Sequence, residues 1–285
     1  MTLKIDHFLT LHLFHRWVGS RPRKGLRLPI LMYHSICDEP ENGHPHFWIN
    51  TSPGRFLEQM ALLAQEGWKV ISLEEVSALL QNRSMPSSSR AVVITFDDGF
   101  RDFYTKAHPI LDRFGFKATV FLPTGRIGKK EPGIRGKAHL DWNEVRELHS
   151  RGIRFGSHTV NHLPLEDLEE GMIDFEVRRS KEMIEDKIGE EVTSFSCPYR
   201  FPEPNGALID RLRNSLRQAG YQTGVSTKIG TVGIGEDRFS LSRLPVSTGD
   251  DPEIFRAKLE GAYDWVHSLQ RRYKAFRKWF SQSHV

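Results

Sequence analysis

Short apolar segments alternate with longer amphipathic segments along most of the chain. The apolar segments have the length of buried strands, which we expect at residues 28–34, 68–72, 91–96, 117–122, 153–157, 193–197, 221–225 and 239–244. Apolar residues recur with helical spacing between them, which predicts helices at 53–66, 73–80, 100–114, 141–150, 171–188, 205–219 and 251–259. Residue types that cap helix N-termini stand where several of these helices begin: Ser52, Ser72, Asp141, Asn205 and Asp251.

Strict alternation of strand and helix predicts a mostly parallel sheet with helices on its outside. Because nearly eight repeats occur, we expect the sheet to close into a barrel, and 285 residues fit one barrel domain. We place the barrel at residues 28–262, between an N-terminal extension at 1–27 and a basic, aromatic C-terminal helix at 263–285.

Composition narrows the class of protein. Hydrophobic residues make up 38% of the chain and charged residues 27%, as in a globular protein. The net charge of +4 is small and the basic residues collect near the two ends, so we expect no nucleic acid partner. Cys37 and Cys197 lie far apart and predict neither a disulfide framework nor a cysteine metal site.

The two ends of the chain bear on the cellular location of the protein. The apolar stretch at residues 8–14 is interrupted by His12 and lacks a cleavage site of small residues, so it is a poor signal peptide. We therefore expect a cytoplasmic protein, with association with the cell envelope as the alternative. Residues 264–280 mix aromatic side chains with Arg and Lys, which indicates a terminal helix on the body of the protein or, alternatively, peripheral contact with a membrane.

Polar residues with catalytic potential follow the predicted strands. Asp97 and Asp98 come directly after the strand at 91–96, and His158 follows the strand at 153–157, with His162 four residues later. One carboxylate and two imidazoles are a common ligand set for a catalytic divalent cation, which leaves the second carboxylate available as a base. Each motif alone is more often a turn or a helix cap.

The position of these motifs favours the catalytic interpretation. His34 ends the first predicted strand, and Pro198 and Tyr199 follow the sixth. In barrels of this kind, catalytic groups come from the carboxyl ends of the strands and from the loops after them. The motifs are therefore expected to meet at one end of the barrel.

Taken together, the motifs resemble those of the polysaccharide deacetylase family, also called the NodB homology domain or carbohydrate esterase family 4. The resemblance rests on residues 95–99 (Thr-Phe-Asp-Asp-Gly), 157–162 (Ser-His-Thr-Val-Asn-His) and 195–199 (Phe-Ser-Cys-Pro-Tyr). Residues 29–34 (Pro-Ile-Leu-Met-Tyr-His) mark the branch with an N-terminal Tyr-His strand. The resemblance implies an irregular α/β barrel of about seven strands that removes N-acetyl or O-acetyl groups, with N-acetyl favoured, from an acetylated glycan.

The resemblance also implies residue roles. Asp97 corresponds to the general base, and Asp98, His158 and His162 correspond to ligands of Zn²⁺ or of Co²⁺, Ni²⁺ or Fe²⁺. The backbone N–H of Tyr199 corresponds to a donor for the oxyanion of the tetrahedral intermediate.

Two positions depart from the family pattern. The third motif has Ser196 where relatives carry an arginine that orients the base, and we expect Arg243 in the last strand to take that place. Arg200 is nearer in sequence, but it is expected to be an exposed loop residue. Many relatives supply a late histidine as general acid, whereas His267 lies in the terminal helix. We therefore expect His34 to be the acid.

Two other functions fit the same fold. One is a non-catalytic glycan-binding protein, against which the intact Asp97 argues. The other is a hydrolase of a different non-peptide C–N bond, such as that of a cyclic amide. The polar loops at 39–50 and 125–136 favour an open groove for a glycan over a closed pocket. The sequence specifies no oligomeric state.

Overall fold

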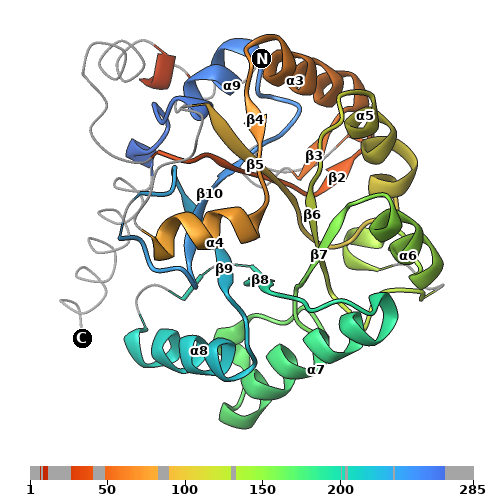
Figure 1. Cartoon of the computed structure of the whole chain (residues 1–285), viewed down its shortest axis with the longest axis vertical. Helices are drawn as coiled ribbons and strands as arrows, with labels where there is room; N and C mark the ends of the chain where they lie inside the picture. The colour runs from red at the N-terminus through yellow and green to blue at the C-terminus, as the bar shows by residue number, and fades with distance from the viewer. Residues whose placement is uncertain are drawn as a thin grey trace.

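A ring of parallel strands forms the centre of the protein (Figure 1). The computed structural model describes residues 7, 9–11, 27–40, 49–82, 90–129, 133–199, 201–202, 205–233 and 235–266. Within this part of the chain, seven strands close into a barrel: β1 (Ile30–Tyr33), β10 (Leu241–Pro245), β9 (Thr223–Ile229), β8 (Ser194–Ser196), β7 (Arg154–Ser157), β6 (Thr119–Leu122) and β5 (Ala91–Phe96). Because β1 pairs with both β10 and β5, the ring closes, and the predicted single-domain α/β barrel of about seven strands is confirmed.

Three short strands of the described chain lie outside the ring. β4 (Lys69–Val70) pairs with the first residues of β5, and β2 (Ser35–Ile36) pairs with β3 (Asn50–Thr51). β4 corresponds to the second of the eight predicted strands, so each predicted apolar segment forms a strand but only seven enter the barrel. The pattern does not predict β2 and β3, because strands of two residues are too short to show the alternation on which the prediction depends.

Helices surround the barrel: α3 (Pro53–Gln65), α4 (Leu73–Gln81), α5 (His108–Arg113), α6 (Trp142–Ser150), α7 (Glu170–Ile188), α8 (Gly206–Gln218) and α9 (Pro252–Leu259). Each predicted N-cap is confirmed, because the side chains of Ser52, Ser72, Asp141, Asn205 and Asp251 accept hydrogen bonds from backbone N–H groups of the first turn. The helices α7 and α8 lie side by side on the outside of the barrel (Figure 1).

The helix predicted at 100–114 is wrong at its start. The helical segment begins only with a π-helical turn, η3 (Phe103–Ala107), and this turn continues into the α-helix α5. Pro109 lacks the N–H that an α-helix would donate to the carbonyl four residues earlier, so the regular hydrogen-bond ladder is broken at this point. Phe100 forms an antiparallel bridge with His139 instead of a helical turn. Two further short helices, η4 (Ile134–Gly136) and η5 (Leu165–Asp167), lie in loops.

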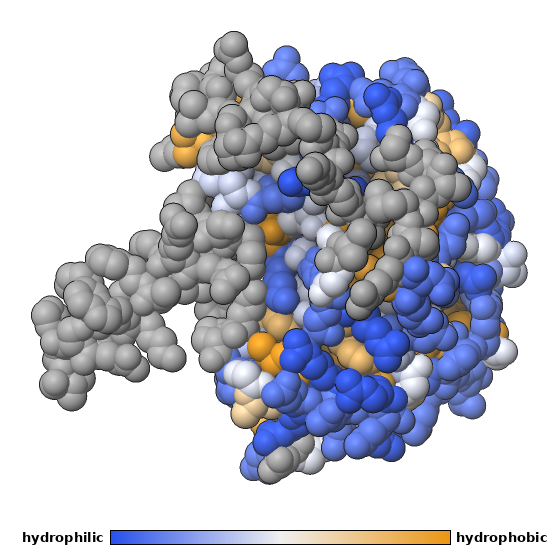
Figure 2. Space-filling model, turned by 60° about the vertical axis from the view of Figure 1, so that its left-hand side comes forward, coloured by the Kyte–Doolittle hydropathy of each residue, from blue (hydrophilic) through white to orange (hydrophobic). Residues whose placement is uncertain are grey.

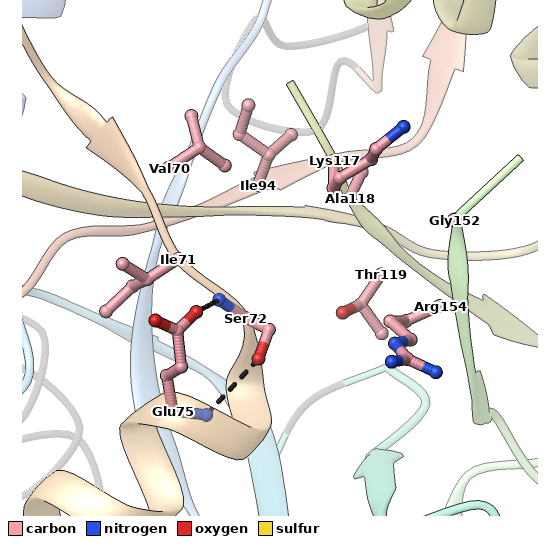
Figure 3. Close-up of a pocket in the computed structure, with 10 residues that line it drawn as sticks. All are labelled: Val70, Ile71, Ser72, Glu75, Ile94, Lys117, Ala118, Thr119, Gly152 and Arg154. Atoms are coloured by element: carbon pink, nitrogen blue, oxygen red, sulfur yellow. Dashed lines mark hydrogen bonds between the residues drawn. The ribbon is translucent and has the colours of Figure 1, made fainter. Parts of the chain in front are cut away.

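A pocket of about 230 Å³ opens at the amino ends of β6 and β7 (Figure 3). Along β5, the carbonyls of Arg90 and Val92 accept hydrogen bonds from the segment that contains β4. The N–H groups of Val93 and Asp97 donate hydrogen bonds to the segment that contains β1. Since alternate residues of a strand face opposite edges, β4 and β6 share one edge of β5, and the pocket lies where they diverge beside Ile94. The candidate catalytic residues do not line this pocket.

The barrel interior changes from apolar to polar along its axis. Val93 in β5, Phe121 in β6 and Leu241 in β10 belong to one buried cluster. Because side chains alternate between the two faces of a strand, Asp97 lies on the same side as Val93, and Arg243 lies on the same side as Leu241. The apolar interior therefore ends, towards the carboxyl ends of the strands, in an ion pair between these two residues.

Hydrophilic side chains dominate the described surface on the face shown in Figure 2, where hydrophobic residues form small separate patches. No helix of the described residues is both long and apolar enough to cross a membrane. In the predicted N-terminal extension, the hydroxyl of Thr10 is buried and accepts a hydrogen bond from Nε1 of Trp265 at 3.0 Å. Most of the predicted C-terminal helix, including His267, lies outside the described residues.

Candidate active site

The barrel brings the candidate residues together at the carboxyl ends of its strands. Asp97 and Asp98 follow β5, and His158 follows β7. His34 follows β1, and Tyr199 lies three residues beyond the end of β8. Charges on Asp97, Asp98, Arg243 and His158 all influence the pKa of His34, which places its ring in the same electrostatic environment.

Asp98, His158 and His162 form a compact group of potential metal ligands. One atom from each side chain lies within 4.8 Å of the others, and all three residues are buried. Oδ1 of Asp98 lies 3.1 Å from Nε2 of His162 and 3.5 Å from Nε2 of His158. Ligand atoms about 2.1 Å from a zinc ion lie about 3.4 Å apart in a tetrahedral arrangement, so these separations fit a shared cation.

The protonation of His158 supports this fit. Its Nδ1 lies 2.8 Å from the backbone carbonyl oxygen of Ser196, and because that oxygen can only accept, Nδ1 carries the proton. In the neutral ring, Nε2 then presents a lone pair towards the carboxylate of Asp98. A cation between Nε2 and the carboxylate would take the place of the Nε2 proton, which the two aspartates otherwise favour.

Unusual backbone conformations concentrate in this site. Of the five non-glycine residues with positive φ in the described chain, four lie here: Asp98 (69°), Thr159 (65°), His162 (55°) and Tyr199 (54°). Such conformations cost free energy and persist where the surroundings enforce them, which is typical of functional sites.

The loop that carries the two histidines is held from α7. Glu176 has no exposed surface, and its Oε2 accepts hydrogen bonds from the N–H groups of Val160 and Asn161 at 2.7 and 2.9 Å. Its Oε1 accepts a third from Nδ2 of Asn161 at 2.6 Å. The hydroxyl of Thr159 accepts from the N–H of His162 at 3.0 Å. The segment between the histidines is therefore fixed by the carboxylate of Glu176 and by the hydroxyl of Thr159.

Arg243 contacts Asp97 as the sequence predicts. Its guanidinium is fully buried and donates from Nη1 and Nη2 to the two carboxylate oxygens at 2.7 and 2.6 Å. Nε donates to the carbonyl of Ser226 at 3.0 Å, and Nη2 also donates to the hydroxyl of Ser196 at 3.1 Å. Ser196, which stands where the family motif has an arginine, thus contacts the arginine that comes from β10.

Charge and burial set the ionisation of the two carboxylates. Burial alone would raise the pKa of Asp97, but the charges of Arg243 and His158 and the hydrogen bonds from Arg243 together outweigh burial and hold this pKa below its usual value. Burial likewise opposes ionisation of Asp98, but its contacts with His158 and His162 hold its pKa well below the usual value. For His158, the two aspartates outweigh the effect of burial and raise the pKa. Both carboxylates are therefore ionised at neutral pH.

The remaining predicted residues have looser contacts. Tyr199 is 54% exposed, and the centroid of its ring lies 4.7 Å from the centroid of the His162 ring. His34 is half-buried, and burial lowers its pKa below the usual value against the opposing charges of Asp98 and Asp97. Arg200 lies outside the described residues.

Sequence reasoning missed two residues that contact the ligand loops, His139 and Glu176. A signal exists for Glu176, because it falls on the face of its helix that buries Ile173 and Val177, where a charged residue is unusual without a partner. Nothing in the local pattern singles out His139. Burial lowers the pKa of His139, and its Nδ1 lies 2.8 Å from the backbone oxygen of Asp98.

A closed parallel barrel with an Asp-His-His cluster and a second carboxylate at the carboxyl ends of its strands is the arrangement of a hydrolytic barrel enzyme. The chain belongs to the polysaccharide deacetylase family, whose members hydrolyse carbon–nitrogen bonds other than peptide bonds. The family model, polysaccharide deacetylase, matches residues 84–224. The protein YxkH of Bacillus subtilis (strain 168), which carries the name of this family, is 32% identical over 244 residues, or 86% of this chain and 79% of that protein.

Two further similarities concern named deacetylases. The poly-beta-1,6-N-acetyl-D-glucosamine N-deacetylase of Escherichia coli (strain K12) is 28% identical over 141 residues, which cover 46% of this chain and 20% of that protein. The structure of the Streptococcus pyogenes deacetylase PplD in complex with acetate matches with a TM-score of 0.70 and 27% identity, and the match covers 83% of this chain and 99% of that one.

Proposed function

We propose that this protein is a metal-dependent N-deacetylase of a glycan that contains N-acetylglucosamine. The observation that carries the proposal is the Asp98, His158 and His162 cluster beside a separate carboxylate, Asp97, that is held ionised by a buried arginine. The name of the Escherichia coli relative, an N-deacetylase of poly-beta-1,6-N-acetyl-D-glucosamine, supports this substrate class. We take Zn²⁺ as the first candidate cation, because the ligand set has two imidazoles and one carboxylate.

The residues divide the chemistry between them. A divalent cation held by Asp98, His158 and His162 would lower the pKa of a water molecule and polarise the acetyl carbonyl. Asp97 accepts the proton of the attacking water, and Arg243 fixes the carboxylate in position and in its ionised form.

Two further groups act in the reaction, one as the oxyanion forms and the other as the C–N bond breaks. The backbone N–H of Tyr199, which makes no hydrogen bond within the described residues, donates to the oxyanion that forms from the carbonyl oxygen. His34 donates a proton to the amine nitrogen as the C–N bond breaks, and acetate and the free amine are released.

The proposed function predicts chelator-sensitive release of acetate. Purified protein is incubated with oligomers of N-acetylglucosamine of different linkage, with and without a chelator, and acetate is measured. We expect release that the chelator abolishes and that added Zn²⁺ or Co²⁺ restores, because the cluster loses its cation and regains it. Oligosaccharides that carry only O-acetyl groups serve as the comparison. Release that is insensitive to the chelator, or no release from any acetylated glycan, would contradict the proposal.

Replacing His34 with alanine is expected to lower turnover by about 10²- to 10⁴-fold, the range typical of a general acid. An acid acts in its protonated form, so the wild-type rate should fall as the pH rises through the pKa of His34, which burial lowers. This alkaline limb of the profile of kcat against pH should disappear in the variant. The measurement is kcat over a pH series, and an unchanged rate and profile would assign the role to another group.

A further inference from the structure

His139 is bonded to the backbone of the metal-ligand residue Asp98. It lies in a segment that runs antiparallel to the residues after β5: Phe100 bridges to His139, and Leu140 donates its N–H to the carbonyl of Gly99 at 2.9 Å. Within this arrangement, Nδ1 of His139 lies 2.8 Å from the carbonyl oxygen of Asp98. His139 is 6% exposed, so this hydrogen bond is shielded from solvent.

The contacts of the ring define one tautomer of His139. The carbonyl of Asp98 can only accept, so Nδ1 carries a proton and donates it. The N–H of Ile134 donates to Nε2 at 3.2 Å, so Nε2 is the acceptor. The neutral Nδ1–H form satisfies both hydrogen bonds: Nδ1 pairs with the carbonyl of Asp98, and Nε2 pairs with the N–H of Ile134.

The position of the ring is fixed by its neighbours. The imidazole stacks on the ring of Phe100, with centroids 5.3 Å apart and an interplanar angle of 28°. A Cβ added at Gly133 would lie 2.0 Å from Nε2, so only glycine leaves space for the ring at this point. His139 cannot turn away from Asp98 without displacing the segment that carries it.

The conformation of Asp98 explains why such a bond matters. Its φ of 69° is in the left-handed region that residues with side chains rarely adopt. Rotation about the N–Cα bond moves the carboxylate relative to the barrel, and in the observed conformation Oδ1 lies 3.5 Å from Nε2 of His158 and 3.1 Å from Nε2 of His162. Without the donor from His139, the buried carbonyl loses a partner and the left-handed conformation loses a restraint.

We propose that His139 is a positioning residue for the metal site: the hydrogen bond from its Nδ1–H to the carbonyl of Asp98 keeps the Asp98 carboxylate directed at the two histidines. The inference rests on the proposed function, because it takes Asp98, His158 and His162 as the metal ligands. His139 itself touches neither the cation nor the substrate.

The two nitrogens can be tested separately with two amide variants. In His139→Asn the amide nitrogen takes the place of Nδ1 and keeps the donor to Asp98. In His139→Gln the amide oxygen takes the place of Nε2 and keeps only the acceptor for Ile134. Affinity for Zn²⁺ is measured by competition with a chromophoric chelator, together with the melting temperature of the metal-free protein.

We expect His139→Gln to bind Zn²⁺ about 10- to 100-fold more weakly, which is the usual effect of losing a hydrogen bond to a metal-ligand residue. The Zn²⁺ affinity of His139→Asn should stay close to that of the wild type. Gly133→Ala, which displaces the ring, should resemble His139→Gln. His149→Gln is the matched control, because this half-buried histidine pairs with Glu190 and does not contact the metal cluster.

The outcomes separate the inference from the proposed function. A wild-type protein that binds no Zn²⁺ would contradict the proposed function and remove the basis of the inference. Wild-type binding with equal affinity in His139→Gln would overturn the positioning role alone. Equal weakening in the Asn and Gln variants, parallel to equal losses in melting temperature, would show that the residue acts only through the fold and would also overturn it.

Discussion

Replacing Asp98 with alanine is expected to weaken metal binding by at least about 100-fold. Loss of a residue that only hydrogen-bonds to a metal ligand already lowers metal affinity by about 10- to 100-fold. Replacing Asp97 with asparagine is expected to leave metal binding intact and to lower turnover by about 10²- to 10⁴-fold. The two carboxylates are adjacent in sequence but face different partners: Asp98 contacts His158 and His162, and Asp97 contacts Arg243. Bound metal per protein and acetate release are the two measurements.

A nearby carboxylate provides the control for this pair. Asp102 is partly buried and accepts a hydrogen bond from the hydroxyl of Ser35, and Asn in its place can accept the same bond. Asp102→Asn should therefore keep both metal and turnover. The melting temperature of Asp97→Asn is recorded as well, because this change leaves the charge of Arg243 without its counter-charge. Loss of metal in both Asp97→Asn and Asp98→Ala, or activity in both, would break the assignment.

The strands and most of the site could be predicted because they follow local periodicity. Predicted strand segments of five to seven residues, with Asp, His or Tyr at or just after their ends, specify both the strands and the end of the barrel at which those polar side chains lie. Side chains two positions apart on a strand face the same side, so Arg243 lies with Leu241 on the interior side of β10. From there Arg243 reaches Asp97. The small side chain of Ser196 leaves room for this arginine and contacts it.

The contacts that hold the ligand loops could not be predicted in the same way. His139 acts on a carbonyl 41 positions earlier in the chain, and Glu176 acts on N–H groups about 15 positions earlier. Such bonds depend on the path of loops and on left-handed residues at Asp98 and Thr159, and no hydrophobic period encodes them. The π-helical start of the helix after β5 escaped prediction for a related reason, since the apolar spacing continues through the break caused by Pro109.

Replacing Arg243 with methionine is expected to destabilise the protein by about 3–5 kcal/mol and to lower turnover by at least about 100-fold. The guanidinium has no exposed surface, and both of its terminal nitrogens donate to Asp97, so its removal leaves a buried carboxylate without its counter-charge. Arg243→Lys keeps the charge but loses the two parallel bonds, and its loss of turnover should be intermediate. Denaturant unfolding and acetate release measure the two effects.

The pH dependence of the Arg243→Met protein should identify the partner of this arginine. Arg243 holds the pKa of Asp97 below its usual value, so in the wild type the pair contributes stability above the unfolded pKa, near 4, that is lost as the pH falls through the folded pKa. In the variant, burial raises that pKa, so the acidic limb of kcat/KM should move to higher pH. The stability deficit should be largest at neutral pH and shrink in acid.

The double variant Asp97→Asn with Arg243→Met removes both charges from the same buried place. If the ion pair acts as a unit, this protein should be more stable than Arg243→Met alone and should remain inactive, because the base is absent. Additive losses of stability in the double variant, or an acidic limb that does not move in Arg243→Met, would show that Arg243 supports the barrel without controlling the ionisation of Asp97. The arginine of β10 would then be a structural residue, and the orientation of the base would depend on Ser196.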